Sequence, residues 1–271
     1  MRPRGPQFRG GDTCRTPPRQ GRCSAPTPSA ALSFQPFPTR GRLARRLDSP
    51  LGSLRRVIPT VLQECPLYVY IVTSAKVLDG AFAQTGSGPN FQGGFITLCT
   101  CKHKDRASPP KPGCRGSNPN DPWKGVWVAG LCSPSQARPR GLFYLMLVER
   151  TFASHAACWT GLGHPSQKSA HRHPFGDVYE PRASASGSPW TEASYKDHLP
   201  EHCHDSKGRR TDIEVSYYTM KRHPRLLVGD PEWSFLWRAP RITLTPHADT
   251  DWATAHHRFY QELSDFLPTL R

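Results

Sequence analysis

The pattern of apolar and polar residues along this chain changes character near residue 67. Residues 1–56 show neither the alternation of a strand nor the 3.6-residue period of a helix, and they contain nine prolines. From residue 67 onward, short aromatic and β-branched runs alternate with loops rich in glycine, proline and asparagine. The pattern predicts a disordered Arg/Pro-rich tail over 1–60 and a single domain over 67–271.

Several short apolar runs within that domain predict strands. The run at 141–149 is almost wholly apolar, which is typical of a central strand. The run at 95–102 would place Cys99 and Cys101 on one face, because successive strand side chains alternate. The predicted strands lie at 67–73, 95–102, 125–130, 141–149, 213–219 and 225–229.

Two helices complete the predicted elements. Thr151 is expected to cap a short helix that runs toward Trp159. Near the end of the chain, a helical spacing places four apolar residues on one face: Phe259, Leu263, Phe266 and Leu267. The predicted fold class is therefore α+β, with a mostly antiparallel, partly closed sheet over 67–250 and a C-terminal helix packed on it.

The basic charge of the chain is concentrated in the tail. The formal net charge is +15, and residues 1–56 hold twelve arginines against two aspartates, so the remaining residues carry about +5. Three interpretations of the tail stay open: a disordered segment, an Arg-rich arm for nucleic acid, or an untranslated upstream sequence. The third is a hypothesis motivated by the absence of lysine there and of methionine between Met1 and Met146, with initiation at a non-AUG codon near Val57, Val61 or Leu62.

The cysteines and the hydropathy of the chain indicate which cellular compartment to expect. The nine cysteines are an odd number in a long chain and do not suggest a disulfide framework. The N-terminus lacks the apolar run of a secretory signal, and no run approaches the roughly 18 apolar residues of a membrane span. A soluble cytoplasmic protein with free thiols and no membrane partner is expected.

Residues 93–130 carry the first candidate chemistry. Lys102 and Arg106 leave the strand at 95–102 on one polar loop and could hold a phosphate. Cys99 and Cys101 could ligate a metal or supply a nucleophile, but two cysteines on a buried strand are more often small core residues. Trp127 could stack on a base or be a core tryptophan whose indole N–H meets a carbonyl.

Trp123 lies in a loop before that strand, which argues less for a core position than a strand would. Basic groups beside tryptophans can hold an anion and a flat ring together, which is the chemistry of a nucleotide. The segment therefore favours a nucleotide or nucleic acid as the partner.

Two later segments add candidates. Phe175-Gly-Asp-Val-Tyr179 places a carboxylate and a ring in one turn, so Asp177 could be a general base or could hold the loop through an Asx-turn. A second group of polar residues could supply an acid or base, with His198 as the first candidate. Its members are His198, His202, Cys203, His204 and Asp205, with the weaker His171 and His173 upstream. Pro200 makes a helical His-x3-His zinc pair unlikely, so no metal is predicted.

The order of these motifs resembles the second family of nucleotide modification associated domains of bacteria and phages, over about 67–245. The matching segments are Tyr68-Val-Tyr-Ile-Val72, Thr97-Leu-Cys-Thr-Cys-Lys-His-Lys-Asp-Arg106, Gly125-Val-Trp-Val-Ala-Gly130, Tyr144-Leu-Met-Leu-Val-Glu149 and Phe175-Gly-Asp-Val-Tyr179. Late matches are Leu227-Val-Gly and Phe235-Leu-Trp-Arg-Ala-Pro240. The chain departs from the family pattern at His103, where the family has Pro, and at Val126, where it has Asp.

The resemblance implies a place in a DNA base-modification system, and a sheet that looks like a PUA-type barrel. The preferred hypothesis is a domain that binds a nucleotide or modified base, alongside other modification-system proteins. Its nucleotide contacts would be Lys102, Arg106, Trp127 and Tyr179. The alternatives are an enzyme acting on the base or its precursor, with Asp177 or His198 as acid or base, and a non-catalytic scaffold. No cofactor is predicted for any of them.

Overall fold

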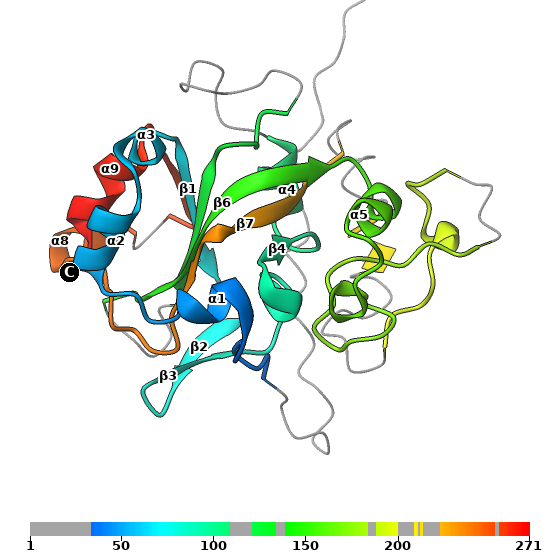
Figure 1. The fold of residues 1–271 in the computed structure, drawn as a ribbon, viewed down its shortest axis with the longest axis horizontal. Coiled ribbons are helices and arrows are strands. Elements are labelled where there is room, and N and C mark those ends of the chain that lie inside the picture. Colours follow the sequence, from blue (N-terminus) through cyan, green and yellow to red (C-terminus); the bar gives the residue numbers. More distant parts are fainter. Residues whose placement is uncertain are drawn as a thin grey trace, which may run out of the picture.

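A curled, mixed sheet of six strands lies at the centre of the molecule in the computed structural model (Figure 1). Its strands are β1 (Leu67–Val72), β4 (Thr97–Leu98), β5 (Trp127–Cys132), β6 (Leu142–Phe152), β7 (Leu226–Leu236) and β8 (His257–Tyr260). They are arranged in the order β4-β7-β6-β5-β1-β8. The β1–β5 pairing is parallel and the other neighbouring pairs of this sheet are antiparallel. The predicted α+β class is confirmed.

The structure describes most of the chain beyond its first part. The described residues are 34–108, 121–133, 139–183, 188–199, 209–210, 212–213, 223–252 and 255–271. Within them no helix is long and apolar enough to cross a membrane.

Helices and a hairpin surround the sheet. The hairpin consists of β2 (Ala75–Leu78) and β3 (Ala81–Gln84). The α-helices are α1 (Gly41–Arg45), α2 (Leu51–Val57), α3 (Thr60–Gln63), α4 (His103–Ala107), α5 (His155–Gly161), α8 (Pro246–Asp251) and α9 (Leu263–Phe266). The 3-10 turns are η1 (Gln92–Gly94), η2 (Ser166–Lys168), η3 (Glu192–Ser194) and η5 (Leu267–Thr269).

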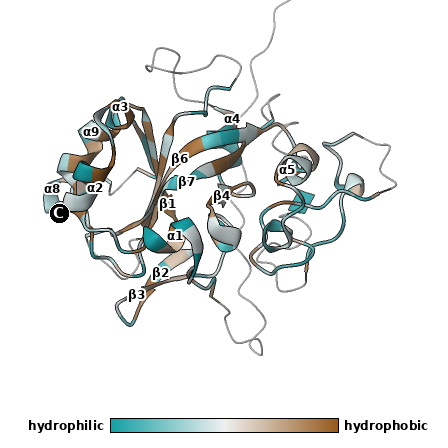
Figure 2. Cartoon of the chain, viewed as in Figure 1, coloured by the Kyte–Doolittle hydropathy of each residue, from teal (hydrophilic) through white to brown (hydrophobic). Residues whose placement is uncertain are grey.

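These elements form two parts, which Figure 1 shows on either side of β4. The sheet, α2, α3, α8 and α9 enclose one large apolar cluster, which we call the main core. Residues 154–183 and 188–199, with α5, form the other part, which we call the side lobe. It contains only small apolar clusters, and its loops are largely hydrophilic (Figure 2). The boundary between the two parts is where the candidate site lies.

The central strands are buried on both faces. Every residue of β1 and β5 is buried, and so are the first seven of β6. Gly130 on β5 makes this packing possible, since a Cβ there would collide with the ring of Tyr144. The strand 141–149 was predicted to be central, and β6 confirms it, because it pairs with β5 on one side and β7 on the other.

The N-terminal region differs from the prediction. Residues 34–66 include three short helices rather than a disordered segment, so the predicted tail is wrong for 34–60. Leu43, Leu54 and Ile58 are buried in the main core. Pro50 and Pro59 stand immediately before helices, where a proline is tolerated, and do not interrupt them. Residues 1–33 lie outside the described part of the chain.

Other element boundaries also differ. The predicted strand 95–102 is reduced to Thr97–Leu98, and the predicted strand at 225–229 continues to Leu236 as β7. The first helix of the side lobe is capped by Ser154, whose hydroxyl accepts from the Ala157 amide, and not by Thr151. Most of the predicted strand 213–219 lies outside the described residues.

The C-terminal helix is present but shorter than predicted. Phe259 belongs to β8 and is 45% exposed, while Leu263, Phe266 and Leu267 are buried. The helix begins after Glu262, which forms a capping box with Asp265. The apolar spacing therefore identified the buried face for Leu263, Phe266 and Leu267 but not for Phe259, because tertiary pairing with β1 extended the preceding residues into a strand.

Candidate functional site

Two of the sequence motifs, about 80 residues apart, meet at the boundary between the sheet and the side lobe. Asp177 lies in the Phe175–Tyr179 motif and is fully buried. Its carboxylate accepts hydrogen bonds from the Thr97 hydroxyl at 2.8 Å and from the Cys99 amide at 3.1 Å. Burial raises the pKa of Asp177 to about 6, and nearby Lys168 opposes that rise. Asp177 thus fastens one motif to the other.

Lys168 supplies the opposite charge beneath this contact. Its ammonium donates to the carbonyls of Asn90 at 2.9 Å and Phe95 at 2.8 Å. Burial lowers its pKa to about 8, and the negative charge of Asp177 acts in the other direction. The hydrogen bonds of both buried groups are internal, which favours a structural role for Asp177 over that of a general base. The expected Asx-turn is not the form of that role, because Asp177 binds Thr97 and Cys99 and the Tyr179 amide donates to His155.

Arg106 is also committed to the protein interior. Its guanidinium donates to the carbonyls of Cys99 and Cys101, each at 2.8 Å, and to that of Arg225. The side chain is 1% exposed, and burial lowers its pKa. Arg106 therefore shapes the loop after β4 instead of presenting a charge to a phosphate.

The two tryptophans are core residues. The Trp127 indole N–H donates to the Leu62 carbonyl at 2.7 Å, and that of Trp123 donates to the Arg106 carbonyl at 2.9 Å. Both side chains are completely buried. Trp123 is therefore a core residue although its position in a loop argued against this, and Trp127 matches the core alternative.

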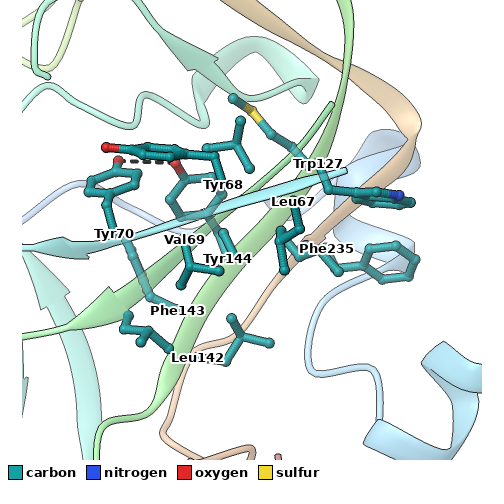
Figure 3. Packing of buried hydrophobic residues seen from close by; sticks show 14 of the residues in the cluster. Leu67, Tyr68, Val69, Tyr70, Trp127, Leu142, Phe143, Tyr144 and Phe235 are labelled. Atoms are coloured by element: carbon teal, nitrogen blue, oxygen red, sulfur yellow. Dashed lines mark hydrogen bonds between the residues drawn. The ribbon is translucent and has the colours of Figure 1, made fainter. Parts of the chain in front are cut away.

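Trp127 and Lys102 lie on opposite faces of the sheet. Trp127 is in register with Leu67, whereas the Lys102 ammonium lies 5.0 Å from the ring centre of Tyr70. Leu67 and Tyr70 are an odd number of residues apart on β1, so their side chains point to opposite faces. Figure 3 shows the cluster of Tyr68, Tyr70 and Tyr144 on one side of β1 and Trp127 directed away from it. The predicted pairing of Lys102 with Trp127 around one ligand is not formed.

Lys102 is the predicted nucleotide contact with the clearest access to solvent. Its side chain is 22% exposed and lies 3.8 Å from Asp105. Burial lowers its pKa, and the Asp105 carboxylate acts in the opposite direction. The backbone of Lys102 is left-handed, with φ of 61°, so the chain turns sharply here into α4. The turn places the next residue, His103, against the side lobe.

His103 belongs to a polar group that the sequence did not single out. Its Nε2 lies 2.5 Å from Asp212 Oδ1, and the Tyr179 hydroxyl donates to Asp212 Oδ2 at 2.8 Å. The side chain of His103 is 18% exposed and that of Asp212 is 1% exposed. His103 stands where the resembled family has a proline, and this departure was the one signal in the sequence. A carboxylate that orients an imidazole in this way suits proton transfer.

His155 extends this group on the other side of Tyr179. The Tyr179 amide donates to His155 Nδ1 at 3.2 Å, so the neutral ring carries its proton on Nε2. Burial lowers the pKa of His155 to about 3, with smaller influences from Asp212, Arg106 and His103. The imidazole is consequently neutral at physiological pH.

The thiols and the remaining histidines lie elsewhere. Cys99 is buried and hydrogen-bonds to Cys158 of α5, whereas Cys101 packs against the main core. The two cysteines therefore do not share a face as predicted. His198 Nδ1 lies 2.8 Å from the carbonyl of Leu199 in the side lobe.

The predicted His198 cluster is divided between the described residues and the rest of the chain. Within the described residues, no three His, Cys, Asp or Glu side chains are grouped so as to hold a metal ion. The remaining members of the His198 cluster lie outside that part of the chain: His202, Cys203, His204 and Asp205.

Comparison with known proteins adds no assignment, since no family model matches the chain and no curated protein or solved structure does either.

Proposed function

We propose that this protein is a nucleotide- or nucleic-acid-binding domain of a base-modification system, related to the second family of nucleotide modification associated domains. The observation that carries the proposal is the contact of Asp177 with Thr97 and Cys99. It brings together two of the motifs on which the resemblance rests. The relation to PUA-type barrels belongs to the same proposal, and the antiparallel pairing of β5 with β6 is consistent with it.

The proposed phosphate contact is Lys102, with exposed Lys104 beside it on α4. Lys102 already lies over the ring of Tyr70, so its ammonium is held at the surface at little further entropic cost. An ammonium in this position attracts a phosphate as a point charge. Tyr179 would act through Asp212, to which its hydroxyl donates, rather than touch the phosphate.

The binding test compares Lys102→Gln with Lys76→Gln, a control at an exposed position on β2. Loss of a hydrogen bond to a charged group costs about 1.5–3 kcal/mol, so Lys102→Gln should weaken binding of nucleoside monophosphates by about tenfold or more. Lys76→Gln should leave the Kd unchanged in the same titration calorimetry. Absence of binding by the wild-type protein, to monophosphates and to short oligonucleotides, would reject the proposal.

A second candidate function is an enzyme that acts on the base or its precursor. The observation that favours it is the group formed by His103, Asp212 and Tyr179, which has the geometry of an oriented acid–base pair. Mass spectrometry of nucleotides after incubation separates the two functions, because a reader leaves its ligand unchanged. If the protein is an enzyme, His103→Gln should abolish turnover but retain binding, with exposed His247→Gln as control.

A further inference from the structure

A small hollow lies next to the His103–Asp212 group, between the side lobe and β7. Its volume is about 10 Å³, roughly the space that one water molecule or one polar group needs. The residues that line it are Ser154, His155, Pro189, Trp190, Asp212, Ile213, Pro224 and Leu226. The lining is therefore mainly apolar, with one imidazole and one carboxylate.

His155, which lines this hollow, has an unsatisfied donor. Its Nδ1 accepts from the Tyr179 amide, which leaves the proton on Nε2. Nε2 is buried and has no hydrogen-bond partner among the described residues. A buried donor without an acceptor costs about 1–3 kcal/mol and is rare in folded proteins. Together with the hollow, this donor indicates a missing acceptor.

The same hollow is also lined by a hydrogen-bond acceptor, Asp212, and by an aromatic side chain, Trp190. Asp212 lines it and is 1% exposed, so its carboxylate acts in a setting largely free of water. Trp190 is half-buried at the rim and stacks on His223, with ring centres 3.3 Å apart. A donor beside an acceptor, next to stacked rings, is complementary to the edge of a nucleobase.

We infer that this hollow receives the hydrogen-bonding edge of a nucleobase, with His155 donating to a ring acceptor and Asp212 accepting from the neighbouring N–H. The inference rests on the proposed nucleotide-binding function and assigns the base to a place distinct from the phosphate contact at Lys102. The hollow holds only the edge, so the rest of the ring lies against Pro189 and Trp190, the more exposed part of the lining.

The test separates base recognition from phosphate binding. Titration calorimetry compares the four common nucleoside monophosphates with ribose 5-phosphate, for the wild-type protein, His155→Phe and the control His247→Phe. The wild-type and control proteins should bind at least one monophosphate about tenfold more tightly than ribose 5-phosphate. In His155→Phe that preference should disappear, while ribose 5-phosphate binds as before.

A second measurement needs no variant and covers the case in which His155→Phe does not fold. A monophosphate that is methylated on its Watson–Crick edge should lose the tenfold preference with the wild-type protein. Equal binding of ribose 5-phosphate and all four monophosphates would overturn the inference but leave the proposed function standing. Absence of any binding would overturn both, and retention of the preference by a folded His155→Phe would show that the hollow holds only water.

Discussion

Asp177 and Lys168 are opposite charges that the fold removes from water together. Each makes hydrogen bonds to neighbouring groups and is stabilised by the charge of the other, so neither is left unsatisfied. The buried guanidinium of Arg106 is likewise satisfied, because it donates hydrogen bonds to the carbonyls of Cys101 and Cys99. At the scale of the residue, burial therefore turns three charged groups that resemble ligand contacts into parts of the scaffold.

Substitution of Asp177 tests this reading. Asp177→Asn removes the charged acceptor of the Thr97 and Cys99 bonds and the negative charge near buried Lys168, and should lower the free energy of unfolding by about 1–3 kcal/mol. Adding Lys168→Met should recover part of that loss, because the unpaired charge is removed. Urea denaturation measures both, with exposed Asp251→Asn as a control that should change little. A double variant as unstable as the sum of the single changes would contradict the pairing.

His155 predicts an acid-dependent loss of stability. Its pKa is about 3 in the folded protein and near 6.5 when the chain unfolds, so the unfolded state takes up a proton first as pH falls. The contribution is present above pH 6.5 and is lost progressively between 6.5 and about 3. The midpoint temperature of thermal unfolding should therefore fall more steeply with decreasing pH over this range for the wild-type protein than for His155→Phe. If the midpoint temperatures of the two proteins fall in parallel with pH, His155 is not held neutral in the folded protein.

At the scale of the element, the short helices before β1 close the main core. Leu43 on α1 and Leu54 on α2 are completely buried, although each helix has only five or seven residues. Such short helices show too few turns for a 3.6-residue period to be recognised, and they depend on packing for their stability. Initiation near Val57, which stays a prediction, would remove both leucines from the chain.

Truncation of these leucines tests the contribution of the helices. Leu43→Ala and Leu54→Ala should each lower the free energy of unfolding by about 2–5 kcal/mol, because each leaves a cavity in the main core. Val61→Ala on α3 is a matched control at a position 68% exposed and should have little effect. Denaturant unfolding provides the measurement. Equal, small effects for all three variants would mean that α1 and α2 are dispensable.

At the scale of the whole molecule, the main core and the side lobe differ in what holds them together. The main core gathers apolar residues from nearly every element around the sheet. The side lobe depends more on polar bonds, such as those from Arg172 and Lys196 to Glu180. Hydrogen bonding with Arg172 lowers the pKa of Glu180 to about 2, so this network stays charged at neutral pH.

This difference predicts unequal local stability. Regions with few buried apolar contacts open at lower free-energy cost than core strands. Backbone amides of 188–199 should therefore exchange with deuterium faster than those of β6 under native conditions, as measured by mass spectrometry. Ligand binding at the proposed hollow should slow that exchange. Equal protection of both regions in the free protein would instead indicate one cooperative unit.

The sequence alone determined the elements with strong local patterns. The aromatic run of β1 and the apolar run of β6 are clear because a buried strand needs little else to be recognised. The C-terminal apolar face was also correct, although pairing with β1 converted Phe259 to a strand residue. These features depend mainly on residues that are close in the sequence, so a local sequence pattern is enough to predict them.

Only the tertiary structure decided which polar residues surround a site. Lys102 and Trp127 are separated by the two faces of the sheet, while His103, His155 and Asp212 come together from distant segments. Charge and ring type are visible in a sequence, but the direction of a side chain and its burial depend on long-range packing. The sequence therefore predicted a chemistry of bases and phosphates, and the fold determined which of the candidate residues are buried and which come together.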